Sequence, residues 1–301
     1  MRRKFYTLDV FTDVALSGNP LAVVLDADGL QPARMQAIAR EFNLSETVFV
    51  LTPRDPVNTA RLRIFTPDAE LPFAGHPTIG AAILIAQLRA SDLLAREEIA
   101  LVLEEEIGLL ACSVRQAKGR AAQASFVAPR LPESLEQTFS PERLAAAVSL
   151  RPADIGFDSH CPSRWSAGVD FTFVPVRSRE AMGRTRPNLA EWPSGPAGSL
   201  NACLYTKEAR GEGIHVRARV FAPTLGVWED PATGSAAVAF AGVAAAFEQP
   251  EDGEHVLLIE QGEEMGRPSL ITLQMRIAGG RLAGVAVSGS AVRILDGFIE
   301  V

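Results

Sequence analysis

Two glycine-containing turns carry residues whose side chains and spacing suit catalysis or the binding of a ligand. Residues 73–80 carry His76, residues 230–237 carry Ser235, and each turn leads into a short apolar run. A glycine in each turn lets another group approach the backbone closely, and His76 and Ser235 fall where a helix cap is expected. The N–H groups at such a helix start, together with the positive end of the helix dipole, favour a carboxylate or another anion.

The similarity of the two copies extends upstream of the turns. Residues 64–67 (IFTP) precede the first turn and residues 220–223 (VFAP) the second, so both copies read strand, proline turn, glycine turn, helix. The repeat predicts two related halves, and two facing turns would hold a small acid from both sides. The alternative interpretation is that each turn only caps a core helix, or that the repeat is a relic of gene doubling.

The remaining pattern predicts the elements that position these turns. We expect helices at 31–41, 79–88, 141–148 and 236–247, and strands at 5–10, 21–25, 48–51, 60–65, 99–103, 109–114, 124–127, 201–206, 215–221, 256–260, 269–277 and 282–294. The polar stretch 118–123 is the expected crossing point between halves. This gives an α+β protein whose first domain comprises residues 1–120 with strand 285–301, and whose second comprises 121–284. Residues 177–198 are expected to form an exposed helix or loop.

Composition and charge exclude several classes of protein. The net charge of −7 argues against nucleic-acid binding, which needs a concentrated basic face. The longest apolar stretch, 236–247, is too short to cross a membrane, which takes about 20 residues. Polar residues interrupt the first segment, so we expect no secretory leader. Three cysteines without a CxxC pair are typical of a reducing cytosol, so a cytoplasmic location is predicted.

Familiar catalytic signatures are absent from the sequence. It contains no P-loop, no strand-linked GxGxxG, no HExxH and no GxSxG. The four histidines are scattered without the spacing of metal ligands, so no metal and no cofactor are expected. The chemistry is therefore left to carboxylates and glycine turns.

Five motifs, taken together and in order, resemble the PhzF family of phenazine-biosynthesis-like proteins. They are Asn19-Pro20 and residues 43–47 (NLSET), 73–78 (FAGHPT), 229–235 (EDPATGS) and 261–269 (QGEEMGRPS). The resemblance covers nearly the whole chain. It implies the fold of diaminopimelate epimerase, with two pseudo-symmetric domains, each a strand-rich barrel around a central helix, and an active site in the cleft between them. It also implies a homodimer.

The resemblance assigns an acid–base role to Glu46, which would move a proton along a small unsaturated acid. On the residues alone, a single Glu ahead of a strand is more often a solvated loop residue. In a closed apolar cleft, burial would raise the pKa of such a carboxyl group toward neutrality.

Further site residues follow from the same resemblance. They comprise the catalytic candidates His76 and Asp230 and the substrate-binding residues Gly75, Gly234, Ser235 and Arg267. Asp230 would orient the substrate or His76, although an Asp before Pro commonly bonds nearby backbone N–H groups. Arg267 would bind a carboxylate, with a structural ion pair as the alternative.

The function expected from these residues is a cofactor-independent isomerase that acts on a small carboxylate-bearing substrate. The cysteine-dependent relatives carry catalytic thiols beside the glycine turns, where this chain has Ala74 and Ala232, and this excludes a two-thiol racemase mechanism. Two alternatives stay open. One is a non-cysteine epimerase or racemase with Glu46 and either His76 or Asp230 as opposed bases, and the other is a non-catalytic protein that binds a small acid.

Overall fold

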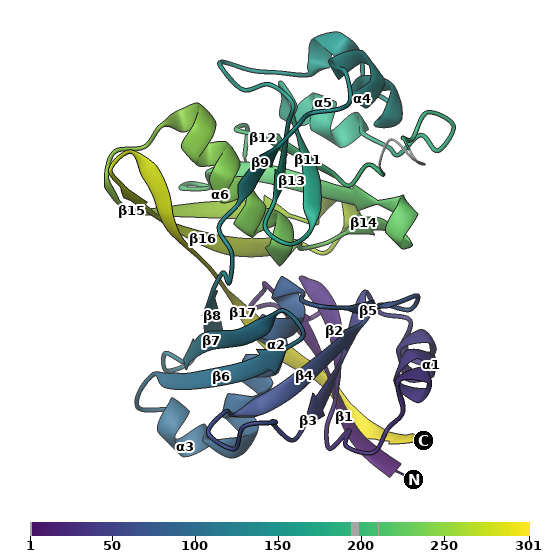
Figure 1. Ribbon diagram of the computed structural model, residues 1–301, viewed down its shortest axis with the longest axis vertical. Helices are drawn as coiled ribbons and strands as arrows, with labels where there is room; N and C mark the ends of the chain where they lie inside the picture. Colours follow the sequence, from purple (N-terminus) through teal and green to yellow (C-terminus); the bar gives the residue numbers. More distant parts are fainter. Residues whose placement is uncertain (1, 194–198, 210) are drawn as a thin grey trace. The chain divides into compact units, whose positions relative to one another are not determined.

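The computed structural model describes residues 2–193, 199–209 and 211–301, which divide into two compact units (Figure 1). Unit 1 comprises Met1–Pro129 and Ala286–Val301, and unit 2 comprises Arg130–Val285. The division between the first and second halves of the chain lies after residue 129 rather than after 120. The reason is strand β8 (Ala122–Val127), which pairs with β7 and with β17 and so stays in unit 1.

Unit 1 is a strand-rich layer that encloses one helix, α2 (Gly75–Arg89), as Figure 1 shows. Its other helices are α1 (Pro32–Phe42) and α3 (Ser91–Leu94). Its strands are β1 (Arg2–Val10), β2 (Asn19–Val24), β3 (Glu46–Leu51), β4 (Ala60–Phe65), β5 (Glu70–Leu71), β6 (Ile99–Glu105), β7 (Gly108–Arg115), β8 and most of β17 (Arg281–Glu300). Every residue of α2 from Gly75 to Ala86 is buried, as expected of a helix that is apolar on all sides.

Unit 2 is built in the same way around α6 (Gly234–Glu248). Its helices also include α4 (Pro141–Ala147), α5 (Arg179–Arg184) and the 3-10 turns η1 (Pro152–Asp154), η2 (Pro223–Leu225) and η3 (Glu263–Met265). Its strands are β9 (Glu133–Leu135), β10 (Ser163–Ser166), β11 (Asp170–Pro175), β12 (Ala202–Thr206), β13 (Val216–Ala222), β14 (Val227–Asp230), β15 (Gly253–Gln261) and β16 (Ser269–Ala278).

Strand pairing repeats between the two units. In unit 1, β1–β2 is antiparallel, β2–β3 parallel, β3–β4 and β4–β5 antiparallel, β4–β6 parallel and β6–β7 antiparallel. The series β10 to β16 of unit 2 has the same sequence of pairings in the same order. The central helices α2 and α6 each have 15 residues and follow β5 and β14 respectively. The predicted α+β architecture of two related barrels is therefore confirmed.

The starts of the two central helices differ from the sequence prediction. The N-cap residues are Ala74 and Thr233, so His76 and Ser235 each occupy the second helical position. The carbonyl groups of these caps accept the first intrahelical bonds, from Thr78 and Ala237. Because His76 is not the cap, its imidazole is not committed to the backbone of its own helix.

Residues 177–198 are less exposed than the sequence predicts. Helix α5 buries Ala181 and Met182, and Trp192 is buried with its indole N–H bonded to the carbonyl oxygen of Leu200. The last part of this predicted loop, 194–198, lies outside the described residues. None of the helices in the described parts of the chain is long and apolar enough to cross a bilayer.

Candidate active site

In unit 1 the structure brings together two of the residues singled out in the sequence, Glu46 and His76. The Oε2 atom of Glu46 lies 3.2 Å from Nε2 of His76, although the contact lacks the angular geometry of a hydrogen bond. Asn19 lies at the other side of the ring, with its amide nitrogen 3.2 Å from Nδ1 of His76. The side chains of Glu46 and His76 are 14% and 4% exposed, so the pair is nearly enclosed.

Three local features of the fold position Asn19, Glu46 and His76. Helix α1 ends at Phe42 and is capped by Asn43, whose left-handed conformation (φ 50°) reverses the chain before β3 begins at Glu46. Strand β3 runs parallel to β2, with Glu46 opposite Leu21. Because β2 begins at Asn19, the amide and the carboxylate come from the same end of two neighbouring strands. The motifs of residues 19–20, 43–47 and 73–78 therefore meet at one point.

His76 is held in its neutral form. Burial lowers the pKa of His76 to about 3, because enclosure in an apolar surrounding penalises the charged imidazolium. The carboxylate at 3.2 Å acts in the opposite direction, but burial of the enclosed ring is the larger effect on the pKa of His76. The amide nitrogen of Asn19 can only donate, so Nδ1 accepts and the single ring proton lies on Nε2, facing Glu46.

In unit 2 the second glycine turn forms a closed hydrogen-bonded loop. The hydroxyl of Thr233 donates to Oδ2 of Asp230 at 2.6 Å. The amide of Gln261 donates to the carbonyl oxygen of Asp230 at 2.7 Å and to the Thr233 hydroxyl at 3.0 Å, and it accepts from the Thr233 N–H at 3.2 Å. The Asp230 carboxylate thus makes a local contact within the turn, with a hydroxyl group, whereas its sequence context favours contacts with backbone N–H groups. Gly234 and Ser235 follow as the first two residues of α6.

The loop that carries Arg267 packs against this turn through Gly262. Gly262 has φ +79°, and a Cβ atom there would lie 2.4 Å from the carbonyl oxygen of Arg267 and 2.6 Å from that of Pro231. The N–H of Arg267 donates to the carbonyl oxygen of Gly262 at 3.0 Å. Only a residue without a side chain allows the two loops to approach this closely.

This close approach gives a testable prediction. Gly262→Ala is expected to lower the free energy of unfolding by about 1–2 kcal/mol for the left-handed backbone and by about 1–3 kcal/mol more for the clash. Gly266→Ala is the matched control, because Gly266 also has a positive φ (+69°) but nothing lies within 4 Å of its Cβ position. Urea denaturation monitored by circular dichroism measures both. Equal losses in the two variants would contradict the close approach.

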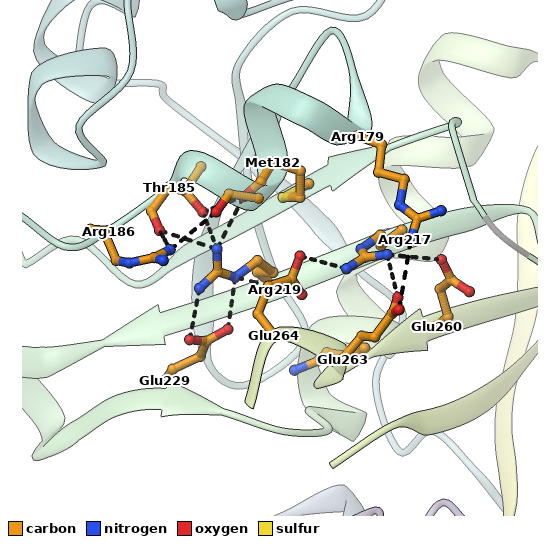
Figure 2. Close-up of polar contacts among 12 residues, drawn as sticks. Arg179, Met182, Thr185, Arg186, Arg217, Arg219, Glu229, Glu260, Glu263 and Glu264 are labelled. Carbon is orange, nitrogen blue, oxygen red and sulfur yellow. Dashed lines mark hydrogen bonds and ion pairs between the residues drawn. The ribbon is translucent and has the colours of Figure 1, made fainter. Parts of the chain in front are cut away.

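Two buried arginines of β13 fix the loops on either side of the turn (Figure 2). Arg219 forms a bidentate pair with Glu229, at 2.8 and 2.9 Å, next to Asp230. It also donates to the carbonyl oxygens of Met182 and Thr185 at 3.0 and 3.1 Å. These two carbonyls belong to the end of α5, where Thr185 also donates to the carbonyl oxygen of Met182, so Arg219 adds a further donor to this helix end.

Arg217 does the same for the loop that leads to Arg267. Its guanidinium group bonds Glu263, and it bonds Glu264 at 2.5 Å, so it binds both glutamates of the 261–269 motif (Figure 2). Arg217 and Arg219 are 4% and 2% exposed. Nothing in the sequence predicts a role for either arginine or for Gln261. The only signal available was the alternation of Arg and apolar residues in the strand 215–221.

The structure therefore groups the predicted site residues by unit. Gly75, His76 and Glu46 lie in unit 1, and Asp230, Gly234, Ser235 and Arg267 lie in unit 2. Trp228, beside the second turn, is 52% exposed and is not a core residue. Within the described ranges, no three His, Cys, Asp or Glu side chains lie together in a way that could hold a metal ion.

A strand-rich barrel around a central helix, repeated in both units, defines the fold class, and the Glu46–His76 pair is the candidate site that this fold positions in unit 1. The family model of the phenazine biosynthesis-like proteins, PhzC-PhzF, matches residues 8–297. The chain belongs to this family. The predicted family, fold class and enzyme class, an isomerase, are confirmed by this match and by the similar proteins.

Two relatives and one solved structure illustrate the similarity. An uncharacterized isomerase of Mesorhizobium japonicum is 47% identical, and trans-2,3-dihydro-3-hydroxyanthranilate isomerase of Pseudomonas aeruginosa is 35% identical, each over 98% of both chains. The crystal structure of a PhzF-family phenazine biosynthesis protein of Bacillus anthracis matches over 100% of both chains, with a TM-score of 0.88 and 27% identity.

Proposed function

We propose that the protein is an isomerase that needs no cofactor, in which the Glu46 carboxylate moves a proton between two carbons of a small carboxylate-bearing substrate. The carboxylate takes the proton from the first carbon, and the electrons of the broken C–H bond enter the unsaturated system of the substrate. The protonated Glu46 then returns the proton to the second carbon. The product is an isomer of the substrate and Glu46 is regenerated.

The contact of Glu46 with a neutral His76 carries this proposal. An imidazole with a pKa near 3 does not compete for the proton that the carboxyl group holds in transit. Its Nε2–H faces the carboxylate and can orient it by donating a hydrogen bond once substrate is bound. The near-complete burial of both side chains also keeps water away from the proton.

The role of unit 2 in the proposal is to hold the substrate. Gly234 and Ser235 begin α6, and the first N–H groups of a helix have no intrahelical acceptor, so they suit a substrate oxygen. We assign the same role, binding of a substrate oxygen, to Gly75 at the start of α2. Arg267 is assigned the binding of the substrate carboxylate, and Asp230 is assigned the orientation of the substrate. The homodimer and the cytoplasmic location remain predictions from the sequence.

The name of the Pseudomonas aeruginosa relative suggests the first compound to test. Trans-2,3-dihydro-3-hydroxyanthranilate is a partly unsaturated ring acid, which fits the substrate class inferred here. We expect the native protein to shift the unsaturation of this acid, or of a related one in a panel of unsaturated acids, as followed by proton NMR. In D2O, deuterium enters the new C–H bond to the extent that the proton on Glu46 exchanges with solvent.

Two other outcomes would overturn the proposal. Inversion at one carbon without a shift of unsaturation would indicate an epimerase with two opposed bases. An acid that raises the thermal unfolding midpoint but is recovered unchanged, with all its hydrogens, would indicate a binding protein.

A further inference from the structure

Beneath the first turn of α2 lies a buried carboxyl group that the proposed reaction does not use. Glu105 is the last residue of β6 and is 8% exposed. Its Oε1 atom lies 2.6 Å from the hydroxyl oxygen of Thr78. The same hydroxyl lies 2.8 Å from the carbonyl oxygen of Ala74, the N-cap residue of α2. His76 lies between these two anchoring residues in the sequence.

The number of hydrogens available to Glu105, Thr78 and Ala74 determines the protonation state of Glu105. A threonine hydroxyl has one hydrogen, and the carbonyl oxygen of Ala74 can only accept, so the Thr78 hydrogen is used there. The 2.6 Å contact with Glu105 then requires the carboxyl group to donate. The geometry is that of a protonated Glu105 donating to Thr78, which donates to Ala74. Burial is consistent with this, because it raises the pKa of Glu105 to about 8.

The charged groups around Glu105 either bind other partners or do not shift its pKa. Arg63 is paired with Glu70 at 2.5 and 2.6 Å, and Glu104 accepts from the N–H groups of Arg54 and Asp55. The titratable and charged groups of the elements that face Glu105 are Arg54, Arg61 and Arg63 on or before β4, Glu70 on β5, Cys112 on β7, His76 on α2, and Glu104 and Glu106 of its own segment. Burial alone raises the pKa of Glu105, and the contact with Thr78 offsets only part of that rise.

Glu105 also has a route to solvent for its proton. It lines a groove of about 460 Å³ on unit 1, between the end of β6 and the start of β5. Arg61 lines the same groove, and its Nε has no hydrogen-bond partner among the described residues, as is also true of Oε2 of Glu105. The groove therefore brings solvent close to Glu105, and only local movement at the groove wall is needed to expose its carboxyl group.

We propose that Glu105 is a positioning residue, whose protonated carboxyl group holds the first turn of α2 and thereby the imidazole of His76, and whose ionisation in alkaline solution releases that turn. Ionised Glu105 can only accept a hydrogen bond, so it competes with the carbonyl oxygen of Ala74 for the single hydrogen of Thr78. Only one of the two hydrogen bonds can then form. The placement of His76 against Glu46 then loosens. The effect of Glu105 ionisation on turnover rests on the proposed function, but its effect on the position of His76 does not.

The direct test measures His76 itself by NMR of 15N-labelled histidine. The chain has four histidines, so the His76 signals are assigned by their loss in His76→Gln. Because the pKa of His76 is about 3, its own protonation leaves the signals unchanged above pH 6. We expect a step in its ring nitrogen shifts with a midpoint near the Glu105 pKa of about 8. The step should vanish in Glu105→Gln, whose amide donates to Thr78 but does not titrate.

The matched control is Glu106→Gln, which removes the exposed neighbouring carboxylate and should leave the step in place. Thr78→Ser keeps the hydroxyl and should also retain it, whereas Thr78→Val should abolish it. Constant His76 shifts between about pH 6.5 and 9.5 in the native protein, or an unchanged step in Glu105→Gln, would overturn the proposal. The thermal unfolding midpoint of each variant at about pH 7 shows that the fold is intact.

A turnover measurement then connects this residue to the reaction. In the native protein, kcat should fall about tenfold between pH 7 and 9 as Glu105 ionises, and in Glu105→Gln this alkaline fall should disappear. A fall that is the same in both proteins would overturn the positioning role. If no substrate reacts, the proposed function fails while the His76 shifts still decide the role of Glu105.

The free energy of unfolding should also depend on pH through Glu105, in a direction that follows from its raised pKa. The folded protein binds the Glu105 proton up to about pH 8, whereas in the unfolded chain this group ionises near its ordinary value of 4.5. Between these values the folded state holds one more proton, so the contribution of Glu105 to stability is full at low pH and is lost as the pH rises through 8. Glu105→Gln should remove this part of the pH dependence.

Discussion

Glu46→Gln is expected to lower kcat by about 10²–10⁴-fold, the range that a general acid–base group contributes, while KM changes by less than about threefold. Glutamine has the same shape and still fits beside His76, but its amide cannot accept and return a proton. Binding of the substrate should therefore persist while its isomerisation stops. Progress curves followed by proton NMR at saturating substrate measure kcat directly.

The control for this variant is Glu41→Gln, which removes an exposed carboxylate from the last turn of α1, five residues earlier in the chain. It should turn over at the native rate. If Glu46→Gln retained more than about a tenth of the native kcat, Glu46 could not be the group that carries the proton. The far-ultraviolet circular dichroism of both variants should match that of the native protein.

Arg219→Met is expected to lower the free energy of unfolding of unit 2 by about 3–5 kcal/mol. Methionine fills much of the volume of the arginine stem but leaves Glu229, whose side chain is only 12% exposed, without its bidentate partner. The carbonyl groups of Met182 and Thr185 each lose one of their donors in the same change, while those from Thr185 and Arg186 remain. For a unit of this size the loss should lower the thermal midpoint by roughly 6–20 °C.

A double variant and an exposed pair serve as controls for Arg219. Arg219→Met with Glu229→Leu should be more stable than Arg219→Met alone, because the uncompensated buried carboxylate is gone. Glu180→Gln breaks the exposed pair with Arg184, in which the two side chains are 87% and 44% exposed, and should cost less than about 1 kcal/mol. Scanning calorimetry compares the three. A loss for Arg219→Met as small as that for Glu180→Gln would contradict the structural role of the Arg219–Glu229 pair.

The sequence predicts the fold well because its strongest signals are local. Residues 79–88 and 236–247 are apolar on every side, and only a helix enclosed by strands satisfies that pattern. The duplicated turns then require that the strands around each helix repeat, as the pairing of β1 to β7 and of β10 to β16 shows. Boundaries were less predictable, since β8 belongs to unit 1 through pairing with β17, more than 150 residues away.

The site was predictable only in part, because its burial depends on residues distant in sequence. A run of three glutamates, residues 104–106, is typical of a solvated turn, and the expected strand therefore ended at residue 103. In the structure both are buried: Glu104 accepts from the N–H groups of Arg54 and Asp55, and Oε1 of Glu105 contacts the hydroxyl of Thr78. Nothing within the run 104–106 itself indicates those partners.

The pairing of β17 with β1 and β8 also has a consequence for biosynthesis. Unit 2 is continuous in sequence, whereas unit 1 contains Ala286–Val301, which a ribosome adds after the whole of unit 2. At about 5–20 residues per second, the first 129 residues must wait roughly 10–30 seconds for their last strand. During that time the edges of β1 and β8 that β17 will cover are open to pairing with other chains. In the nascent protein, the barrel that carries Glu46 and His76 is therefore the last part to close.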